Sequence, residues 1–280
     1  MMNPINTRPA ALAGTWYSAN PQQLHLDVET YLQHAAPTEI PGEIVALIAP
    51  HAGHHYSGPV AGYAFRTIQG NSYETIAVVS PYHRGYPERL LTTSHDRYST
   101  PLGEVPVDTD SLFKLKEQLQ ETAREELALV RQDREHAIEI ELPFLQVAVA
   151  GKFELLPVMV SDSLPETGIA LGKALAAVLK GKKALLIAST DLSHFYPEAA
   201  ANQLDLAMLE AIASFDTEEV IEVHRSGKGQ ACGFLPVLAV MTAAKALGAT
   251  QAHILHYATS GSTSGDYSRV VGYAAGVFTR

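Results

Sequence analysis

The sequence predicts an α/β protein with a mainly parallel central sheet flanked by helices. Short apolar runs of strand length recur along the chain, and segments with a 3.6-residue apolar period lie between them. Most of the apolar runs are continuous rather than alternating, which is typical of strands buried on both faces. Strands that alternate with helices in this way form parallel sheets covered by helical layers.

Five apolar runs are the predicted strands, at residues 44–49, 75–79, 153–160, 184–188 and 252–257. Six predicted helices lie at residues 59–68, 108–119, 138–149, 165–179, 197–213 and 235–247, and several begin with proline or an acidic residue in the first turn. Runs at 89–93 and 270–278 are expected to add antiparallel edge strands. Because no repeat or long flexible linker is visible, we expect a single domain over residues 1–280.

Composition excludes several classes of partner. The 20 Lys and Arg residues against 30 Asp and Glu residues give a net charge of −10, which argues against a nucleic-acid binder. The apolar runs are shorter than the roughly 18 residues that span a bilayer, and the start of the chain lacks the pattern of a secretory signal. We therefore expect a soluble, cytoplasmic protein that binds no membrane. The single cysteine, Cys232, excludes a disulfide framework and an all-thiolate metal site.

Histidines follow three of the predicted strands. His51 follows the strand at 44–49, His83 the strand at 75–79 and His194 the strand at 184–188. In a parallel sheet the ligand crevice lies beyond the carboxyl ends of the strands, and imidazole is the commonest metal ligand in proteins. The pattern predicts that His51 and His83 bind a metal ion; the alternative is that both are hydrogen-bonded loop residues. His54 and His55 are expected to flank this site.

Two further candidates lie close to these histidines or to a helix start. Asp191 and His194 are spaced i, i+3, so on a helical turn the carboxylate would orient the ring, or the ring would carry a proton; alternatively Asp191 caps a helix. Cys232 precedes the helix at 235–247, where a helix N-terminus lowers the pKa of a thiol. The alternative for Cys232 is a small buried apolar residue.

The remaining motifs are less specific. His136 lies three residues before Glu139 at a helix start, which is not the spacing of the zinc proteases. We interpret it as an element that supports the site or contacts substrate, or else as a solvated capping turn. Trp16, the only tryptophan, is expected to anchor the core. The sequence has no P-loop, no strand-linked dinucleotide fingerprint and no serine nucleophile elbow, which argues against nucleotide-cofactor and ordinary serine-hydrolase chemistry.

Six spaced motifs together resemble the Memo family, whose prokaryotic members are called AmmeMemoRadiSam system protein B. They are Ala-Pro-His-Ala-Gly at 49–53, Ser-Pro-Tyr-His at 80–83, Glu-His-Ala-Ile-Glu at 135–139, Ser-Thr-Asp-Leu-Ser-His at 189–194, Ala-Cys-Gly at 231–233 and Gly-Tyr-Ala-Ala-Gly at 272–276. The resemblance runs from residue 14 to the C-terminus. It implies a fold like that of the class III extradiol dioxygenases, in which two histidines and one glutamate hold a non-haem Fe(II) ion and a further histidine is the acid/base.

The resemblance also implies roles for individual residues. His51 and His83 match the two histidine ligands, His194 matches the acid/base, and Cys232 occupies the position of the carboxylate ligand. A thiolate shifts metal preference toward softer ions, so the implied cofactor is Fe(II) or a copper ion, with zinc possible. For the family as a whole, the resemblance implies iron- or copper-linked redox chemistry, phosphotyrosine-peptide binding in eukaryotic members, and a link to a radical SAM protein in prokaryotic ones.

Three functional hypotheses follow. In the first, the chain is a mononuclear metal oxidoreductase in which His194, Asp191 and His136 assist catalysis on an unidentified small molecule. In the second, the same pocket is a non-enzymatic module that binds a peptide or protein partner through its histidines. In the third, the chain is a zinc hydrolase with Glu139 or Glu141 as the base.

Overall fold

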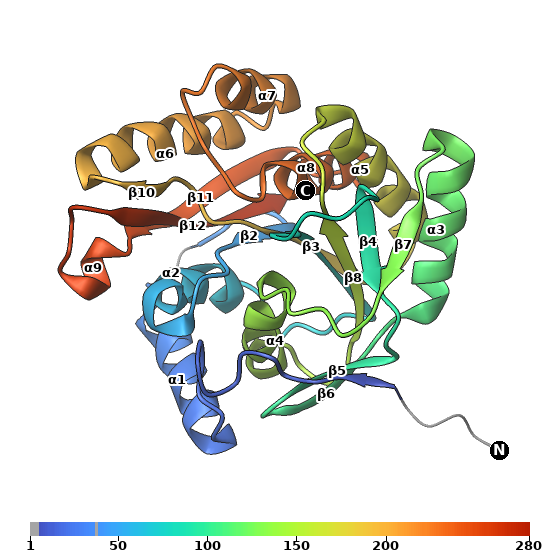
Figure 1. The fold of residues 1–280 in the computed structure, drawn as a ribbon, viewed down its shortest axis with the longest axis horizontal. Coiled ribbons are helices and arrows are strands. Elements are labelled where there is room, and N and C mark those ends of the chain that lie inside the picture. Colours follow the sequence, from blue (N-terminus) through green and yellow to red (C-terminus); the bar gives the residue numbers. More distant parts are fainter. Residues whose placement is uncertain (1–5, 37–38) are drawn as a thin grey trace.

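The computed structural model describes residues 6–36 and 39–280. The first five residues, for which the sequence predicts no secretory signal, lie outside the described residues. Its described part contains a nine-stranded sheet and a separate three-stranded sheet (Figure 1). The strands of the large sheet are β2 (Ile44–Ala49), β3 (Thr75–Pro81), β4 (Leu90–Thr93), β7 (Leu127–Val130), β8 (Glu154–Val160), β9 (Ala184–Ser189), β10 (His194–Tyr196), β11 (Gln251–Thr259) and β12 (Val270–Thr279).

The centre of the large sheet is parallel. The strand order is β10-β12-β2-β9-β3-β8-β4-β7, with β11 also paired to β12, and β2, β9, β3 and β8 are mutually parallel. Within β2, Ala46 and Ile48 pack into the core on one face, whereas Leu47 and Ala49 pack into the core on the other. Both faces are therefore apolar, which explains the continuous runs in the sequence. The predicted α/β class with a mainly parallel sheet is confirmed.

The two expected antiparallel strands are present, but neither lies at an edge. β12 is antiparallel to β2, and β4 is antiparallel to β8. However, β10 and β11 pair with β12, and β7 pairs with the far side of β4. The edge prediction was wrong for two reasons: the pairing of the predicted strand at 252–257 with β12 was not foreseen, and the short strand β7, which pairs with β4, has little sequence pattern of its own.

Helices cover both faces of the sheet. One face packs against α3 (Thr109–Ala123), α5 (Pro165–Leu179), α6 (Glu198–Ala213), α7 (Thr217–Arg225) and α8 (Phe234–Ala246). The other face packs against α1 (Pro21–His34), α2 (His54–Arg66) and α4 (Ala137–Ala148). The short helix α9 (Gly261–Ser264) lies between β11 and β12. No helix in the described ranges is both long enough and apolar enough to cross a bilayer.

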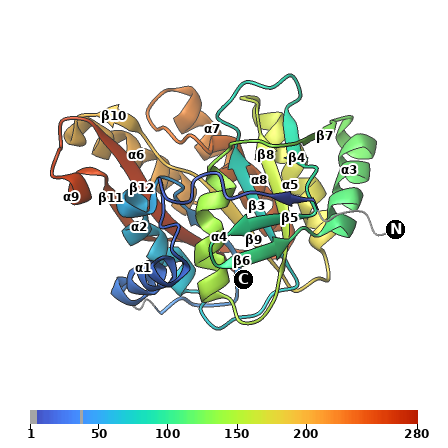
Figure 2. The same ribbon diagram turned by 60° about the horizontal axis from the view of Figure 1, so that its bottom comes forward.

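The small sheet lies beside α4, on the same side of the large sheet (Figure 2). It consists of β1 (Thr7–Arg8), β5 (Arg97–Thr100) and β6 (Gly103–Pro106), in the order β1-β5-β6. The parallel pairing of β1 with β5 fixes the N-terminal segment across the start of α4. This arrangement brings β1, near the N-terminus, beside the start of α4 at one edge of the large sheet.

Candidate metal centre

The carboxyl ends of three adjacent parallel strands bring the first predicted site residues together. His51 lies two residues after β2, His83 two residues after β3, and Asp191 two residues after β9. β9 lies between β2 and β3, with Ala49 paired to Ser189 and Val79 paired to Ala188. The rings of His51 and His83 are 5.2 Å apart, centroid to centroid. The structure therefore brings the two predicted histidine ligands together.

A third imidazole completes the cluster from a different element. His136 is the N-cap residue of α4, and its ring lies 4.4 Å from the ring of His83 and 5.3 Å from that of His51. One nitrogen from each of the three rings lies within 4.8 Å of the other two. Three imidazoles on one rim form a donor set suited to iron, copper or zinc. The three histidines are thus positioned to hold a metal ion.

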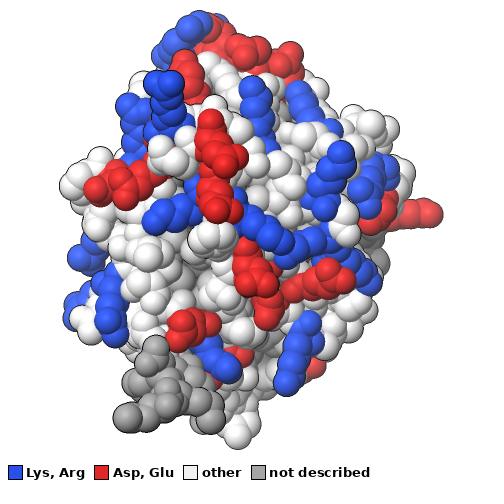
Figure 3. All heavy atoms as spheres, turned by 90° about the vertical axis from the view of Figure 1, so that its right-hand side faces the viewer, with Lys and Arg blue, Asp and Glu red and all other residues white. Residues whose placement is uncertain are grey.

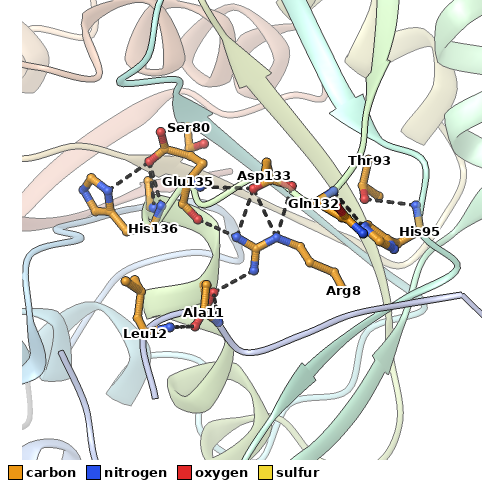
Figure 4. Close-up of polar contacts among 12 residues, drawn as sticks. Arg8, Ala11, Leu12, Ser80, Thr93, His95, Gln132, Asp133, Glu135 and His136 are labelled. Atoms are coloured by element: carbon orange, nitrogen blue, oxygen red, sulfur yellow. Dashed lines mark hydrogen bonds and ion pairs between the residues drawn. The ribbon is translucent and has the colours of Figure 1, made fainter. Parts of the chain in front are cut away.

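Glu135 orients two of the three rings. Its Oε1 atom accepts a hydrogen bond from the backbone N–H of His136 (Figure 4). The same atom lies 2.9 Å from His83 Nδ1, and Oε2 accepts a hydrogen bond from the backbone N–H of His83. Burial raises the pKa of this carboxyl, but the contacts with His83 and His136 outweigh burial and lower it to about 2. Glu135 is therefore ionised at neutral pH and leaves Nε2 of His83 for an ion.

A buried ion-pair network holds this segment in place. Arg8 contacts Glu139 Oε2 at 2.6 Å and Asp133 Oδ1 at 2.9 Å, and it donates a hydrogen bond to the backbone carbonyl of Glu135 (Figure 4). The side chains of Arg8, Asp133 and Glu139 are at most 1% exposed. β1, which contains Arg8, thus anchors the backbone that presents Glu135 and His136.

The same network occupies Glu139. Besides Arg8, its carboxylate accepts hydrogen bonds from the backbone of Ala11 and Leu12 and from the hydroxyl of Tyr17, at 2.7 Å. These donors engage both oxygens, so Glu139 points away from the histidines and is not placed to act as a base beside an ion. His136 thus belongs to the three-histidine cluster, whereas Glu139, three residues later, belongs to the ion-pair network that supports it.

His51 is fixed through both ring nitrogens and its backbone. Its Nδ1 lies 2.9 Å from the hydroxyl of Ser189, and its backbone N–H donates to the carboxylate of Asp191 at 2.8 Å. Its Nε2 lies 3.3 Å from the sulfur of Cys232. A nitrogen and a sulfur bound to one tetrahedral ion would lie roughly 3.5 Å apart. Cys232 is therefore within reach of an ion held by His51, and its role as a ligand, which the resemblance implies, stays a prediction.

Cys232 differs from the prediction in its acidity. It lies just before Gly233, the N-cap of α8, and its sulfur accepts a hydrogen bond from the backbone N–H of Asp191. Burial and the negative charge of Asp191 nevertheless raise the pKa of the thiol, which is the opposite of the expected shift. Desolvation outweighs the helix N-terminus at this position. Within the described residues, the three-histidine group does not include Cys232.

Asp191 and His194 do not lie on a helical turn, so that part of the prediction was wrong. Residues 190–193 are irregular, and His194 begins β10, which pairs with β12. Burial raises the pKa of Asp191 to about 7, and its carboxylate is directed at the backbone of His51. The ring of His194 instead lies with Nδ1 2.9 Å from the carbonyl of Leu192. Asp191 therefore supports His51, and it neither caps a helix nor has a described contact with the His194 ring.

Burial favours the neutral form of His51, His136 and His194. Burial, together with the nearby His136, His83 and His194, lowers the pKa of His51 well below its usual value. Burial also lowers the pKa of His136 to about 4 and that of His194 to a smaller extent. Neutral imidazole is the form that binds a metal ion, so these rings need lose no proton to do so near pH 7.

The neighbouring aromatic and histidine residues lie partly where expected. Trp16 is 39% exposed, with its ring 4.6 Å from that of His136, so it lines the site instead of anchoring the core. His54 is buried with Nε2 against the carbonyl of Ile140, whereas His55 is exposed. Ser189 and Glu135 stand in two of the sequence motifs, but no role was predicted for them, because each contacts a histidine that is distant along the chain.

Comparison with known proteins agrees with the motifs. A family model described as Memo-like protein matches residues 8–277. The chain belongs to the Memo-like family. A MEMO1 family protein of Methanopyrus kandleri is 34% identical over 98% of this chain and 99% of its own length, and one of Nitrosopumilus maritimus is 32% identical over 96% and 98%.

A solved structure supports the fold of this family member. The crystal structure of an uncharacterized protein from Escherichia coli K12 superposes with a TM-score of 0.54, covering 84% of this chain and all of that one. The two sequences are 14% identical, so the likeness concerns the fold alone.

Proposed function

We propose that this Memo-like protein is a mononuclear metal-dependent oxidoreductase. In this proposal His51, His83 and Cys232 bind Fe(II) or a copper ion, and His136 adds a further nitrogen donor. The observation that carries it is the group of three imidazoles with one nitrogen each within 4.8 Å of the other two, and a thiol 3.3 Å from one of them. A bound iron or copper ion would supply one-electron chemistry and open coordination positions for a small molecule.

The residues of the chain have distinct tasks in this proposal. Ser189 and Glu135 fix the rings of His51 and His83, so that the nitrogens facing the ion keep one orientation. A carbonyl can only accept, so the neutral ring of His194 donates its Nδ1–H to Leu192 and leaves Nε2 free to take a proton. His194 is thereby the proton carrier of the site.

A hydrolytic zinc site has less support. It needs a carboxylate that activates water beside the ion. Glu139 is committed to Arg8, and Glu141 is fully buried with a pKa raised well above its usual value by that burial. A neutral Glu141 cannot act as a base. The link to a radical SAM protein and the cytoplasmic location remain predictions.

Metal analysis tests the proposal. The protein would be purified anaerobically without added metal, its iron, copper and zinc content measured, and its oxygen uptake in the presence of a reductant recorded. His51→Ala and His136→Ala should lose most of the metal and the uptake, whereas His25→Ala, on the exposed side of α1, should lose neither. Equal metal content in all three variants and the wild type would refute the site.

Cys232→Ser separates the possible ligand sets. Loss of metal comparable to that of His51→Ala would identify the sulfur as a ligand. Full retention of metal would reduce the ligand set to the three histidines. Bound iron or copper without any oxygen uptake or other electron transfer would contradict the oxidoreductase part of the proposal and leave the metal site intact.

A further inference from the structure

A cavity of about 810 Å³ opens beside the three-histidine cluster. His136 and Trp16 lie in its wall, with their rings tilted against each other and 4.6 Å apart, centroid to centroid, and His136 belongs to the cluster. His95 lies in the wall as well, fixed by contacts with Asn6 and with the backbone of Gln132 (Figure 4). A molecule in this cavity would therefore contact a residue of the proposed metal centre directly.

Three arginines converge on this cavity from two segments of the chain. Arg84 directly follows His83, while Arg131 and Arg134 lie between β7 and α4. All three line the cavity, and all three also line an adjoining cavity of about 320 Å³. The positive charges are thus shared by one continuous wall beside the metal centre.

These arginines carry no compensating charge from the protein. In the part of the chain that the structure describes, no ion pair joins Arg84, Arg131 or Arg134 to an acidic group, and the one acid in the same wall, Asp133, is paired with Arg8. On the face around α3, by contrast, basic and acidic side chains are intermixed over the surface (Figure 3). Among the described residues, the three arginines thus have no acidic partner, although Arg131 donates a hydrogen bond to Asn6 Oδ1 at 3.4 Å.

We propose that the arginines Arg84, Arg131 and Arg134 bind an oxyanion of the substrate, either a carboxylate or a phosphate, while the rest of that molecule extends past Trp16 toward the histidines. Guanidinium groups bind such oxyanions through paired hydrogen bonds, and an unpaired guanidinium is ready to do so. The proposal rests on the proposed function, since it assigns a substrate class to the same site. It makes the arginines determinants of specificity and leaves the metal ligands unchanged.

The only tryptophan of the chain provides a direct measurement. Trp16 lies in the cavity wall, so its fluorescence reports on occupancy without any need for turnover. Metal-free protein would be titrated with sodium phosphate and with sodium benzoate, against sodium chloride at equal ionic strength. We expect a saturable change in emission with at least one of the two oxyanions, and the stronger response identifies the phosphate or the carboxylate as the preferred group.

Variants assign the response to the arginines. Arg131→Gln and Arg134→Gln should each weaken the binding by roughly tenfold, in the range of a lost charge-assisted contact. Arg225→Gln, at an exposed position on α7 outside the cavity, should bind as the wild type does. Circular dichroism confirms that the variants fold.

The outcomes distinguish this proposal from the proposed function. No saturable change with either oxyanion, or equal binding by the arginine variants and the wild type, would overturn the oxyanion subsite even if the protein retains metal. Saturable binding that depends on the arginines supports the subsite even if metal analysis fails.

Discussion

Replacing Glu135 by glutamine tests how far one carboxylate organises the metal centre. In the structure this carboxylate contacts His83 Nδ1 and accepts from the backbone N–H groups of His83, His136 and Ala137. Glu135→Gln keeps the shape of the side chain, but it replaces one oxygen by an NH₂ group that faces donors. At least one of these donors then loses its acceptor, and two of the three rings lose the charge that fixes them.

The expected effect is large for a residue that is not itself a ligand. Loss of a group that orients a metal ligand lowers metal affinity by about 10- to 100-fold, which equals about 1.4–2.8 kcal/mol. Because Glu135 orients both His83 and His136, we expect a loss near the upper end, about 100-fold. Metal titration in competition with a chelator, with Zn(II) in air and Fe(II) under anaerobic conditions, measures it.

A matched control separates this effect from a general change in charge. Glu154→Gln removes the same charge at an exposed position at the start of β8, far along that strand from the carboxyl ends, and should leave metal affinity unchanged. If folded Glu135→Gln protein bound both metals within about twofold of the wild type, the carboxylate would not orient the ligands and the reasoning would fail.

Urea unfolding of three further variants tests how much the residues that support the site contribute to the free energy of unfolding. Glu141 is fully buried, and this burial raises its pKa although Ser189 partly offsets it, so the folded form keeps a proton that the unfolded chain releases above about pH 4.5. This group therefore makes the free energy of unfolding fall as pH rises, by up to about 1.4 kcal/mol per unit, and Glu141→Gln should remove that contribution, so that variant and wild type diverge by this amount per unit between pH 5 and 7; parallel curves would contradict it. Arg8→Met leaves Asp133 and Glu139 buried without their cation, and should lower the free energy of unfolding by about 3–5 kcal/mol; a loss below about 1 kcal/mol would show that the network is not needed. Gly233→Ala places a Cβ against the carbonyl oxygen of Ser189 and 2.7 Å from Thr190 Cβ, and should cost about 1–3 kcal/mol; an unchanged midpoint would mean that the backbone there moves freely.

The elements that the sequence predicted best are those with a clear apolar pattern from end to end. β2 begins and ends at the predicted residues 44 and 49, and α5 begins and ends at 165 and 179. In both, apolar residues are continuous or periodic, and a proline or a polar residue directly follows the last position. α7, in contrast, buries only Val220 among its apolar positions and was not predicted, since its packing depends on α6 and α8.

The candidate site was predictable only where it follows from strand topology. His51 and His83 follow adjacent parallel strands, and the carboxyl ends of such strands share one edge. The geometry of Asp191 and His194 was mispredicted because β10 forms by pairing with β12, which begins about 75 residues later in the sequence. His136 joins the cluster because Arg8 fixes the start of α4, a contact between residues 127 or more positions apart.

The number of protons released when a metal ion binds distinguishes a sulfur from a nitrogen as the additional ligand. His51 and His136 are held neutral by burial, so an ion bound through them displaces no proton from these rings near pH 7. The thiol of Cys232 has a raised pKa in the metal-free protein, so an ion can bind the sulfur only by displacing its proton. Sulfur ligation therefore releases a proton and strengthens as pH rises, whereas binding by His51 and His136 does neither near pH 7. The same burial that makes Cys232 a poor free nucleophile thus makes its thiolate dependent on a bound cation, which is the behaviour of a ligand.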